Sequence, residues 1–164
     1  MQEHQTQVKI VRPQIGLTRR FMNNLITFKA VSADTHGIYS LFEISTPSSE
    51  GMLPHLQWYD DETFWVLEGT YSFLFGVQAL ELGAGGYAFV PRGTVHSFIN
   101  SGSSTARMLS LFTPGGIHER FYVEAGKPAV HPWRVLVPPD PTDLPRIIKI
   151  ARKYGIEMHL PASA

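Results

Sequence analysis

The sequence predicts an all-β domain, built as a sandwich or closed barrel, with one α-helix near its C-terminal end. Short stretches rich in β-branched and aromatic residues recur at regular spacing between residues 25 and 112. Turn-forming sequences, such as Asp34–Gly37 and Gly83–Gly86, separate these stretches, which is typical of sandwiches and barrels of short strands. After residue 141 the apolar residues recur instead at the period of a helix.

The composition indicates one globular domain over residues 1–164 that lies in the cytoplasm and does not bind nucleic acid or membranes. Hydrophobic residues make up 43% of the chain, and 14 basic residues balance 14 acidic ones, which removes the electrostatic argument for an anionic partner. No apolar run approaches the ~20 residues that span a bilayer, and the N-terminal residues lack the apolar core of a signal peptide. Because the chain has no cysteine, any metal must be held by nitrogen and oxygen ligands.

The strands are predicted in the following order. They cover residues 25–30, 38–45, 55–59, 62–67, 71–75, 79–82, 87–90, 96–100 and 107–112. Gly76 indicates a hairpin between two of them, and Asp60-Asp61 indicates a solvated bend between two others. Residues 1–24 are polar and irregular. They could pair as an edge strand through Val8 and Ile10, or lie over the mouth of the barrel.

The C-terminal part predicts one helix at about residues 142–154, laid on the outside of a barrel that covers about residues 25–125. Thr142 is a good N-cap, and Asp143 lies in the first turn, where the helix dipole favours a negative charge. One apolar stripe is formed by Leu144, Ile147, Ile148 and Ala151. Gly155 is the expected residue after the helix. A proline-rich link, residues 128–141, leads to this helix.

Four residues form a cluster with a chemical interpretation: His55, Gln57, Glu62 and His96. His55 and Gln57 are two residues apart, so they face the same side of an extended strand. Strict alternation would turn Glu62 to the other side, but a bend at Asp60-Asp61 can restore the facing. Two imidazoles, a carboxylate and an amide oxygen could then converge on one metal ion, and two histidines with one carboxylate are the ligands of many non-haem iron sites.

These residues also carry a family resemblance. Residues 54–69, PHLQWYDDETFWVLEG, and residues 85–100, GGYAFVPRGTVHSFIN, resemble the two halves of the cupin pattern, G-x5-H-x-H-x3,4-E-x6-G and G-x5-P-x-G-x2-H-x3-N. The second half is complete, with Gly85, Pro91, Gly93, His96 and Asn100 at the family spacing. The first half is met at His55, Glu62 and Gly69, whereas Gln57 replaces the second histidine and Ser49 the leading glycine.

The resemblance selects one fold among the barrels and sandwiches, the cupin jelly-roll or double-stranded β-helix barrel. The flanking sequences are similar to small single-domain cupins described as quercetin 2,3-dioxygenase-like. The resemblance implies one divalent transition metal per subunit, iron, nickel, manganese, cobalt or zinc, bound by His55, Gln57, Glu62 and His96. A metal-free remnant of the family site is the alternative. Gln57 either binds the metal, swings away to open a position for substrate, or marks a decayed site.

The function implied by this resemblance is a metal-dependent dioxygenase of the quercetinase type. Glu62 would be both a ligand and the catalytic base that takes the substrate hydroxyl proton. Phe64, Val66 and Phe98 share the strand parity of the ligands, so we expect them to line the pocket of a small flat substrate, although core packing alone would explain them. The alternatives are a small-molecule-binding cupin without turnover and a metal-assisted isomerase or lyase.

The remaining candidate residues receive simpler interpretations. The other five histidines have no partner at ligand spacing and are interpreted as surface or turn residues: His4, His36, His118, His131 and His159. Trp58 and Trp65 have the opposite strand parity and are expected under the outer helix or at a dimer contact. An exposed apolar barrel face suggests a homodimer with two-fold symmetry, the commonest state of soluble oligomers.

Overall fold

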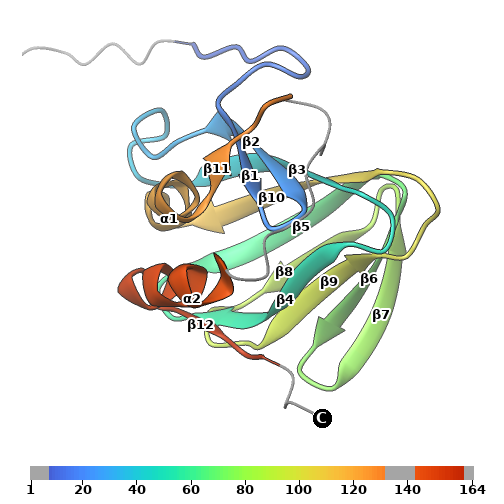
Figure 1. The fold of residues 1–164 in the computed structure, drawn as a ribbon. Helices are drawn as coiled ribbons and strands as arrows, with labels where there is room; N and C mark the ends of the chain where they lie inside the picture. The colour runs from blue at the N-terminus through green and yellow to red at the C-terminus, as the bar shows by residue number, and fades with distance from the viewer. Residues whose placement is uncertain (1–7, 132–142, 161–164) are drawn as a thin grey trace, which may run out of the picture.

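Two antiparallel sheets face each other and enclose the core between them (Figure 1). The structure is a computed structural model and describes residues 8–131 and 143–160. The chain crosses between the sheets repeatedly: β3 lies in one sheet, β4 in the other, β5 in the first again, and β8, β9 and β10 continue the alternation. This is the jelly-roll arrangement that the sequence predicts.

The strands fall into a seven-stranded and a five-stranded sheet. The seven-stranded sheet contains, in spatial order, β11 (Lys127–Pro128), β1 (Thr18–Phe21), β2 (Asn24–Ala30), β3 (Ser40–Thr46), β10 (Ala106–Thr113), β5 (Asp61–Glu68) and β8 (Tyr87–Val90). The five-stranded sheet contains β12 (Ile156–Met158), β4 (Gly51–Gln57), β9 (His96–Asn100), β6 (Thr70–Phe75) and β7 (Gln78–Gly83).

Alternation of side chains along the strands builds the core. In β3 and β10, every second residue is buried, because successive side chains of a strand point to opposite faces. Phe42 of β3 and Phe112 of β10 meet edge to face at 5.8 Å between ring centroids, an arrangement that aromatic pairs prefer. Ser110 is the one polar residue on the buried face of β10.

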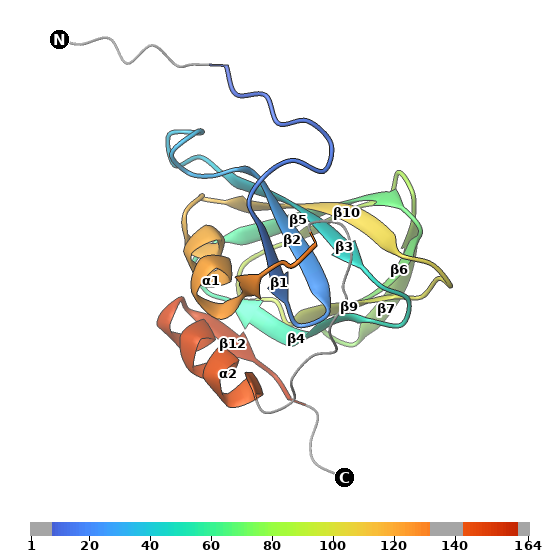
Figure 2. The ribbon, with the colours of Figure 1, turned by 45° about the horizontal axis from the view of Figure 1, so that its top comes forward.

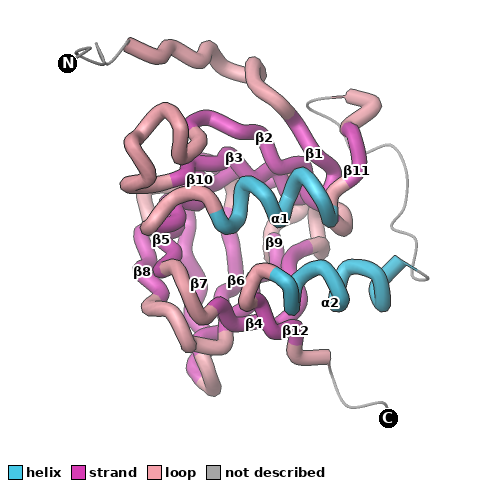
Figure 3. Tube along the Cα trace, turned by 90° about the vertical axis from the view of Figure 1, so that its left-hand side faces the viewer, coloured by secondary structure: helices cyan, strands magenta, loops and turns pink. Residues whose placement is uncertain are grey.

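Two helices lie on one side of the barrel, one above the other (Figure 3). α2 (Leu144–Lys153) corresponds to the predicted C-terminal helix and buries Ile147 and Ala151 of the predicted stripe. The predicted N-cap, Thr142, lies outside the described residues. α1 (Ile117–Ala125) was not predicted as a helix. None of the helices in the described part of the chain has the length and apolar character that crossing a membrane requires.

The N-terminal part differs from both sequence expectations. Val8 and Ile10, the residues proposed for an edge strand, are 88% and 82% exposed and belong to no strand. Residues 8–17 instead lead to β1 outside the two sheets (Figure 2), where Lys9, Val11 and Pro13 line a cavity together with residues of β2, β3 and β10. β1 pairs with β2 on one side and with the short β11 on the other, so the pairing segment lies later in the chain than predicted.

Candidate metal centre

The cluster predicted from the sequence forms inside the barrel. β4 supplies His55 and Gln57, β9 supplies His96, and β5 supplies Glu62. His55 and His96 are opposite each other in the β4–β9 pair. β4 and β5 belong to different sheets, so the bend between them carries Glu62 to the facing wall. The odd step of five positions from Gln57 to Glu62 is therefore compatible with a shared interior.

One ligand atom from each of His55, Glu62 and His96 lies within 4.8 Å of the other two. All three side chains are buried. Nδ1 of His55 is 2.8 Å from the carbonyl oxygen of Leu53, and Nδ1 of His96 is 2.9 Å from that of Thr94. A carbonyl accepts only from N–H, so these contacts place the proton on Nδ1 and leave Nε2 as the donor atom toward a metal, which is how protein-bound metals are commonly held.

Glu62 is held on both of its carboxylate oxygens. The hydroxyl of Ser110 donates to Oε1 at 2.6 Å. Nε2 of His96 lies 3.0 Å from Oε2, and Nε2 of Gln57 donates to the same oxygen at 3.3 Å. Ser110 was missed by the sequence analysis. The available signal was its polar side chain on the otherwise apolar inward face of β10.

The electrostatics of the cluster favour neutral His55 and ionised Glu62. Burial, supported by the charge of His96, lowers the pKa of His55 to about 3. Burial alone would raise the pKa of Glu62, but the hydrogen bond and charge of His96, with the charges of His118 and His55, lower it overall. Burial opposes a charge on His96, yet the hydrogen bond and charge of Glu62 raise its pKa. A neutral imidazole and a carboxylate are the forms that bind metal.

Gln57 provides an independent indication that the site fits a metal ion. Its side chain is buried, and its Oε1 has no hydrogen-bond partner among the described residues. A buried acceptor without a partner costs free energy, and a cation beside it would satisfy it. With two imidazoles and one carboxylate already converging, the donor set fits a divalent transition metal.

The three residues expected to line the pocket are buried in the interior that contains the cluster. Phe64 of β5 lies 6.1 Å from His96 and 5.9 Å from Phe98 between ring centroids. Phe64, Val66 and Phe98 all belong to the hydrophobic core. The shared strand parity with the ligands is thus confirmed, and the three residues form the apolar wall behind the cluster.

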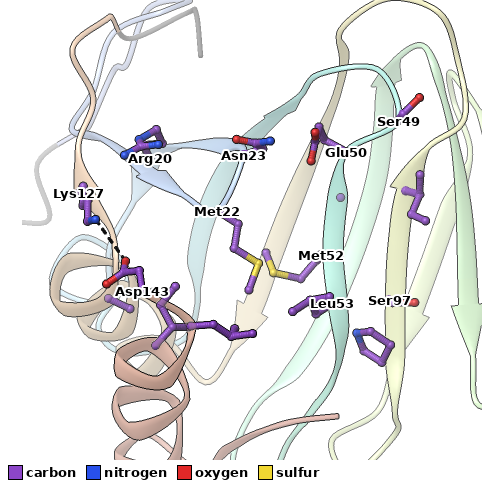
Figure 4. Close-up of a pocket in the computed structure, with 16 residues that line it drawn as sticks. Arg20, Met22, Asn23, Ser49, Glu50, Met52, Leu53, Ser97, Lys127 and Asp143 are labelled. Atoms are coloured by element: carbon purple, nitrogen blue, oxygen red, sulfur yellow. Dashed lines mark ion pairs between the residues drawn. The ribbon is translucent and has the colours of Figure 1, made fainter. Parts of the chain in front are cut away.

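A large cavity lies elsewhere, between the β1–β2 turn, β4, β9 and the start of α2 (Figure 4). Its volume is about 490 Å³. Pro54 and Ser97 line it, each next in sequence to a cluster histidine. Ser97 and His96 point to opposite faces of β9 because side chains alternate along a strand. The cavity is therefore behind the wall that carries the cluster and is not the metal-binding space.

Two interpretations of polar residues are wrong. Asp60 was assigned to a solvated bend and His118 to the surface, yet both are buried and paired, with His118 Nδ1 2.7 Å from Asp60 Oδ2. The adjacent Asp61 does lie at the edge of the bend, where Arg92 binds it. The long separation in sequence and the unpredicted helix α1 hid the Asp60–His118 contact.

The tryptophans also differ from expectation. Trp58 and Trp65 are 49% and 53% exposed, so neither packs beneath the outer helix. Nε1 of Trp58 donates to Glu157 at 2.8 Å. Trp65 contacts Tyr87 of β8 on the outer face of the seven-stranded sheet. The alternative expectation for these residues, a dimer contact, remains a prediction.

Comparison with known proteins supports the resemblance seen in the sequence. The cupin domain family model matches residues 42–112, which include all four cluster residues. Quercetin 2,3-dioxygenase from Bacillus subtilis (strain 168) is 29% identical over 99 residues. That match covers 60% of this chain, and the chain spans only 29% of the length of that relative.

Solved structures share the fold. A predicted oxalate decarboxylase from Thermotoga maritima aligns with a TM-score of 0.60 and 16% identity, over 65% of this chain and 99% of its own. The polyketide cyclase RemF from Streptomyces resistomycificus aligns with a TM-score of 0.58 and 20% identity, over 65% of this chain and 80% of its own. At such low identity these likenesses establish the jelly-roll architecture alone.

Proposed function

Because this chain is a small cupin that resembles quercetin 2,3-dioxygenase-like proteins, we propose that it is a metal-dependent dioxygenase acting on a small, flat, enolisable or aromatic substrate. The observation that carries the proposal is the buried convergence of His55, Glu62 and His96, with both imidazoles held at Nδ1 by backbone carbonyls. Fixed ligand orientation is a property of sites that bind metal strongly.

The cluster residues and their apolar neighbours would have the following roles. His55, Glu62 and His96 hold one divalent transition metal, with Gln57 as a fourth ligand through its partnerless amide oxygen. A bound metal of this kind would stabilise the substrate enolate and bring it together with dioxygen. The resemblance assigns removal of the substrate hydroxyl proton to Glu62. Phe64, Val66 and Phe98 supply the apolar wall against which a flat substrate would lie.

The test is oxygen uptake by metal-loaded protein with a panel of flavonols and other enolisable aromatics. Wild-type protein should consume oxygen, and His96→Ala should lose most of its metal and its turnover, because one of three convergent donors is gone. Glu68→Gln is the matched control. Glu68 lies in the same strand as Glu62 and its side chain is 62% exposed, so this variant should retain both metal and turnover.

The outcomes separate an enzyme from a binding protein. Uptake that follows metal content across wild type, Glu68→Gln and His96→Ala supports the oxygenase. Flavonols could instead bind without any oxygen uptake when the protein is loaded in turn with iron, nickel, manganese, cobalt and zinc. That result would favour a small-molecule-binding cupin over the oxygenase. Full metal content in His96→Ala would show that His96 is not a metal ligand.

A further inference from the structure

The turn between β8 and β9, residues 91–95, is bonded to the bend between β4 and β5, residues 58–60, and to the residue that follows this bend. Nε of Arg92 donates to Oδ1 of Asp61 at 3.0 Å, and its Nη2 donates to Oδ2 at 2.9 Å. Nη1 of the same guanidinium donates to the carbonyl oxygen of Tyr59 at 3.1 Å. The backbone N–H of Arg92 also donates to Oδ1 of Asp61, at 2.9 Å. One arginine thus binds both oxygens of the carboxylate and a carbonyl of the bend.

A backbone hydrogen bond joins the same two segments at a second point. The N–H of Gly93 donates to the carbonyl oxygen of Gln57 at 2.7 Å. Gly93 has a left-handed backbone, with φ of 78°, a conformation that favours glycine. Gln57 is the last residue of β4 and Asp61 the first of β5. The turn therefore holds the residues on both sides of the bend.

The same turn is bonded to a cluster histidine and begins beside Glu62. The carbonyl oxygen of Thr94 accepts from Nδ1 of His96 at 2.9 Å. The N–H of Thr94 donates to the carbonyl oxygen of Pro91 at 3.2 Å, which closes the turn. Glu62 is opposite Val90, the last residue of β8, in the β5–β8 pair. The turn thus contacts His96 directly and lies next to the strand position of Glu62.

The ion pair between Arg92 and Asp61 is suited to fixing geometry. The two side chains are 47% and 23% exposed, and exposed ion pairs contribute little to the free energy of unfolding. A guanidinium that binds both oxygens of a carboxylate nevertheless fixes direction as well as distance. The pair is therefore better suited to setting the relative position of two segments than to holding the barrel together.

We propose that Arg92 is a positioning residue for the metal centre, which sets the spacing of Glu62 and His96 by joining the bend to the turn. The inference rests on the proposed function and deepens it. Glu62 follows Asp61 directly, and the turn that contains Arg92 holds the ring of His96. A shift between bend and turn therefore moves one ligand relative to the other. β5 and β9 belong to different sheets, so a shared ladder of hydrogen bonds does not set this spacing.

The bend has further anchors on the side of the two helices. The N–H of Trp58 donates at 3.0 Å to the carbonyl oxygen of Gly155, which lies just after α2. Oδ2 of Asp60 is 2.7 Å from Nδ1 of His118 in α1. Removing the Arg92 side chain should therefore leave the bend attached to the helices and the protein folded, while the side-chain tie to the turn is lost.

The experiment measures metal affinity and coordination geometry without turnover. Competition with a chelator gives the Zn²⁺ affinity, and the visible absorption of Co²⁺-loaded protein reports the arrangement of the ligands. Arg92→Gln removes the ion pair, and we expect it to lower the Zn²⁺ affinity about 10-fold, the lower end of the range for partners outside the ligand set. The Co²⁺ spectrum should change with it. Arg92→Lys keeps the charge but not the two-pronged contact, and should have intermediate affinity.

Arg107→Gln is the matched control. Arg107 of β10 forms ion pairs with Glu43 and Glu68 and is 39% exposed, so the variant removes a comparable surface contact at the other end of β5. It should leave the Zn²⁺ affinity and the Co²⁺ spectrum at their wild-type values. Asp61→Asn with Arg92→Gln completes a double-mutant cycle. Because the two residues act as a unit, the double variant should lose no more affinity than Arg92→Gln alone.

The outcomes separate this inference from the ligand assignment. Equal Zn²⁺ affinities of Arg92→Gln and wild type would overturn the positioning role and leave the metal centre and the oxygenase proposal standing. Equal losses of affinity in Arg92→Gln and Arg107→Gln would overturn it as well, because the effect would then follow from a general loss of stability. Wild-type protein that binds neither Zn²⁺ nor Co²⁺ would remove the proposed metal centre, and this inference with it.

Discussion

Ser110 and Glu62 meet diagonally across the β10–β5 pair, where the serine hydroxyl donates a 2.6 Å hydrogen bond to Oε1 of the carboxylate. Both side chains are buried. The contact leaves Oε2 as the oxygen that faces His96. Ser110 thereby fixes which edge of the carboxylate is available to a metal, in the way that outer partners commonly orient metal ligands.

Replacing Ser110 with alanine should weaken metal binding. Ser110→Ala removes the donor to Glu62 with little change in volume, so the carboxylate loses its fixed orientation while the barrel stays folded. Loss of such a partner typically costs about 10–100-fold in metal affinity. Competition between the protein and a chelator for Zn²⁺ measures the change. Ser72→Ala, in β6, is the control, and equal affinities in the Ser110→Ala and wild-type proteins would contradict the role given to Ser110.

Gln57→His should bind late divalent metals more tightly than wild type. Gln57 shares β4 with His55, and its Oε1 has no partner among the described residues. Imidazole is the stronger donor to late divalent metals, and it would complete the cupin ligand pattern. The same chelator competition compares the Zn²⁺ affinities of Gln57→His and wild type, and the rise in melting temperature on adding Zn²⁺ is a second measurement. Unchanged affinity would show that position 57 does not contribute a ligand.

Asp143 should stabilise the protein in a pH-dependent way. Hydrogen bonds from Arg146, with the nearby Lys127, hold the pKa of Asp143 at about 2. The pKa of a free aspartate is about 3.9, so the folded state favours the carboxylate. This stabilisation is fully present above about pH 4 and disappears as the pH falls through about 2.

Asp143→Asn should therefore be less stable than wild type at pH 7, by about 1 kcal/mol or less because the ion pairs are partly exposed. The difference should shrink as the pH falls below about 4. Asp143 makes no side-chain cap bond to α2, so helix capping does not confound the comparison. Urea unfolding of both proteins at a series of pH values measures the difference in their free energies of unfolding. A difference that stays constant down to pH 3 would contradict the stabilising role given to ionised Asp143.

The exposed outer face of β5 and β8 leads to a prediction about assembly. Trp65 is opposite Tyr87 in this pair, and the two side chains are 53% and 57% exposed. Phe89 of β8 is exposed as well. We expect a homodimer that buries these rings, and Trp65→Ser should shift it toward monomer. Leu80→Ser in β7 is the control. Light scattering over a wide concentration range that gives only the mass of one subunit in the wild type would refute the dimer.

The cluster was predictable because its determinants are local. His55 and Gln57 are separated by one residue, and the turn before His96 fixes where β9 begins, so spacing indicated how these side chains face. The place of Glu62 followed from the bend at Asp60-Asp61 and from the resemblance to the cupin pattern. The contact between Glu62 and Ser110 spans 48 residues, and that between Asp60 and His118 spans 58. Such contacts depend on strand register and helix placement, which no local pattern specifies.

Helix α1 was missed for a related reason. Its buried residues, His118, Phe121, Tyr122 and Ala125, do follow the helical spacing. The first of them is a histidine, so the apolar stripe contains only three residues and is too short to stand out. The same histidine was then assigned to the surface because its acidic partner comes from a distant bend. A buried polar residue on an apolar face thus obscured both the helix and the pair.

Two glycines of the cupin pattern should differ in how strongly they are required. Gly69 and Gly85 both have a left-handed backbone, with φ of 78° and 87°, a conformation that costs other residues about 1–2 kcal/mol. A Cβ atom on Gly69 would lie 2.6 Å from Cβ of Ala106, whereas one on Gly85 would meet nothing within 4 Å. Only Gly69 is therefore also required for space.

Gly85→Ala should lower the free energy of unfolding by about 1–2 kcal/mol, the backbone cost alone. Gly69→Ala should lower it by about 2–5 kcal/mol, because overpacking against β10 adds about 1–3 kcal/mol. Urea unfolding of the two variants and wild type gives the comparison. Neither substitution touches a residue of the cluster, so zinc affinity of the folded proteins should stay the same. Equal losses of stability in the two variants would mean that β10 shifts to accommodate the added methyl group, and that the close approach at Ala106 does not restrict position 69.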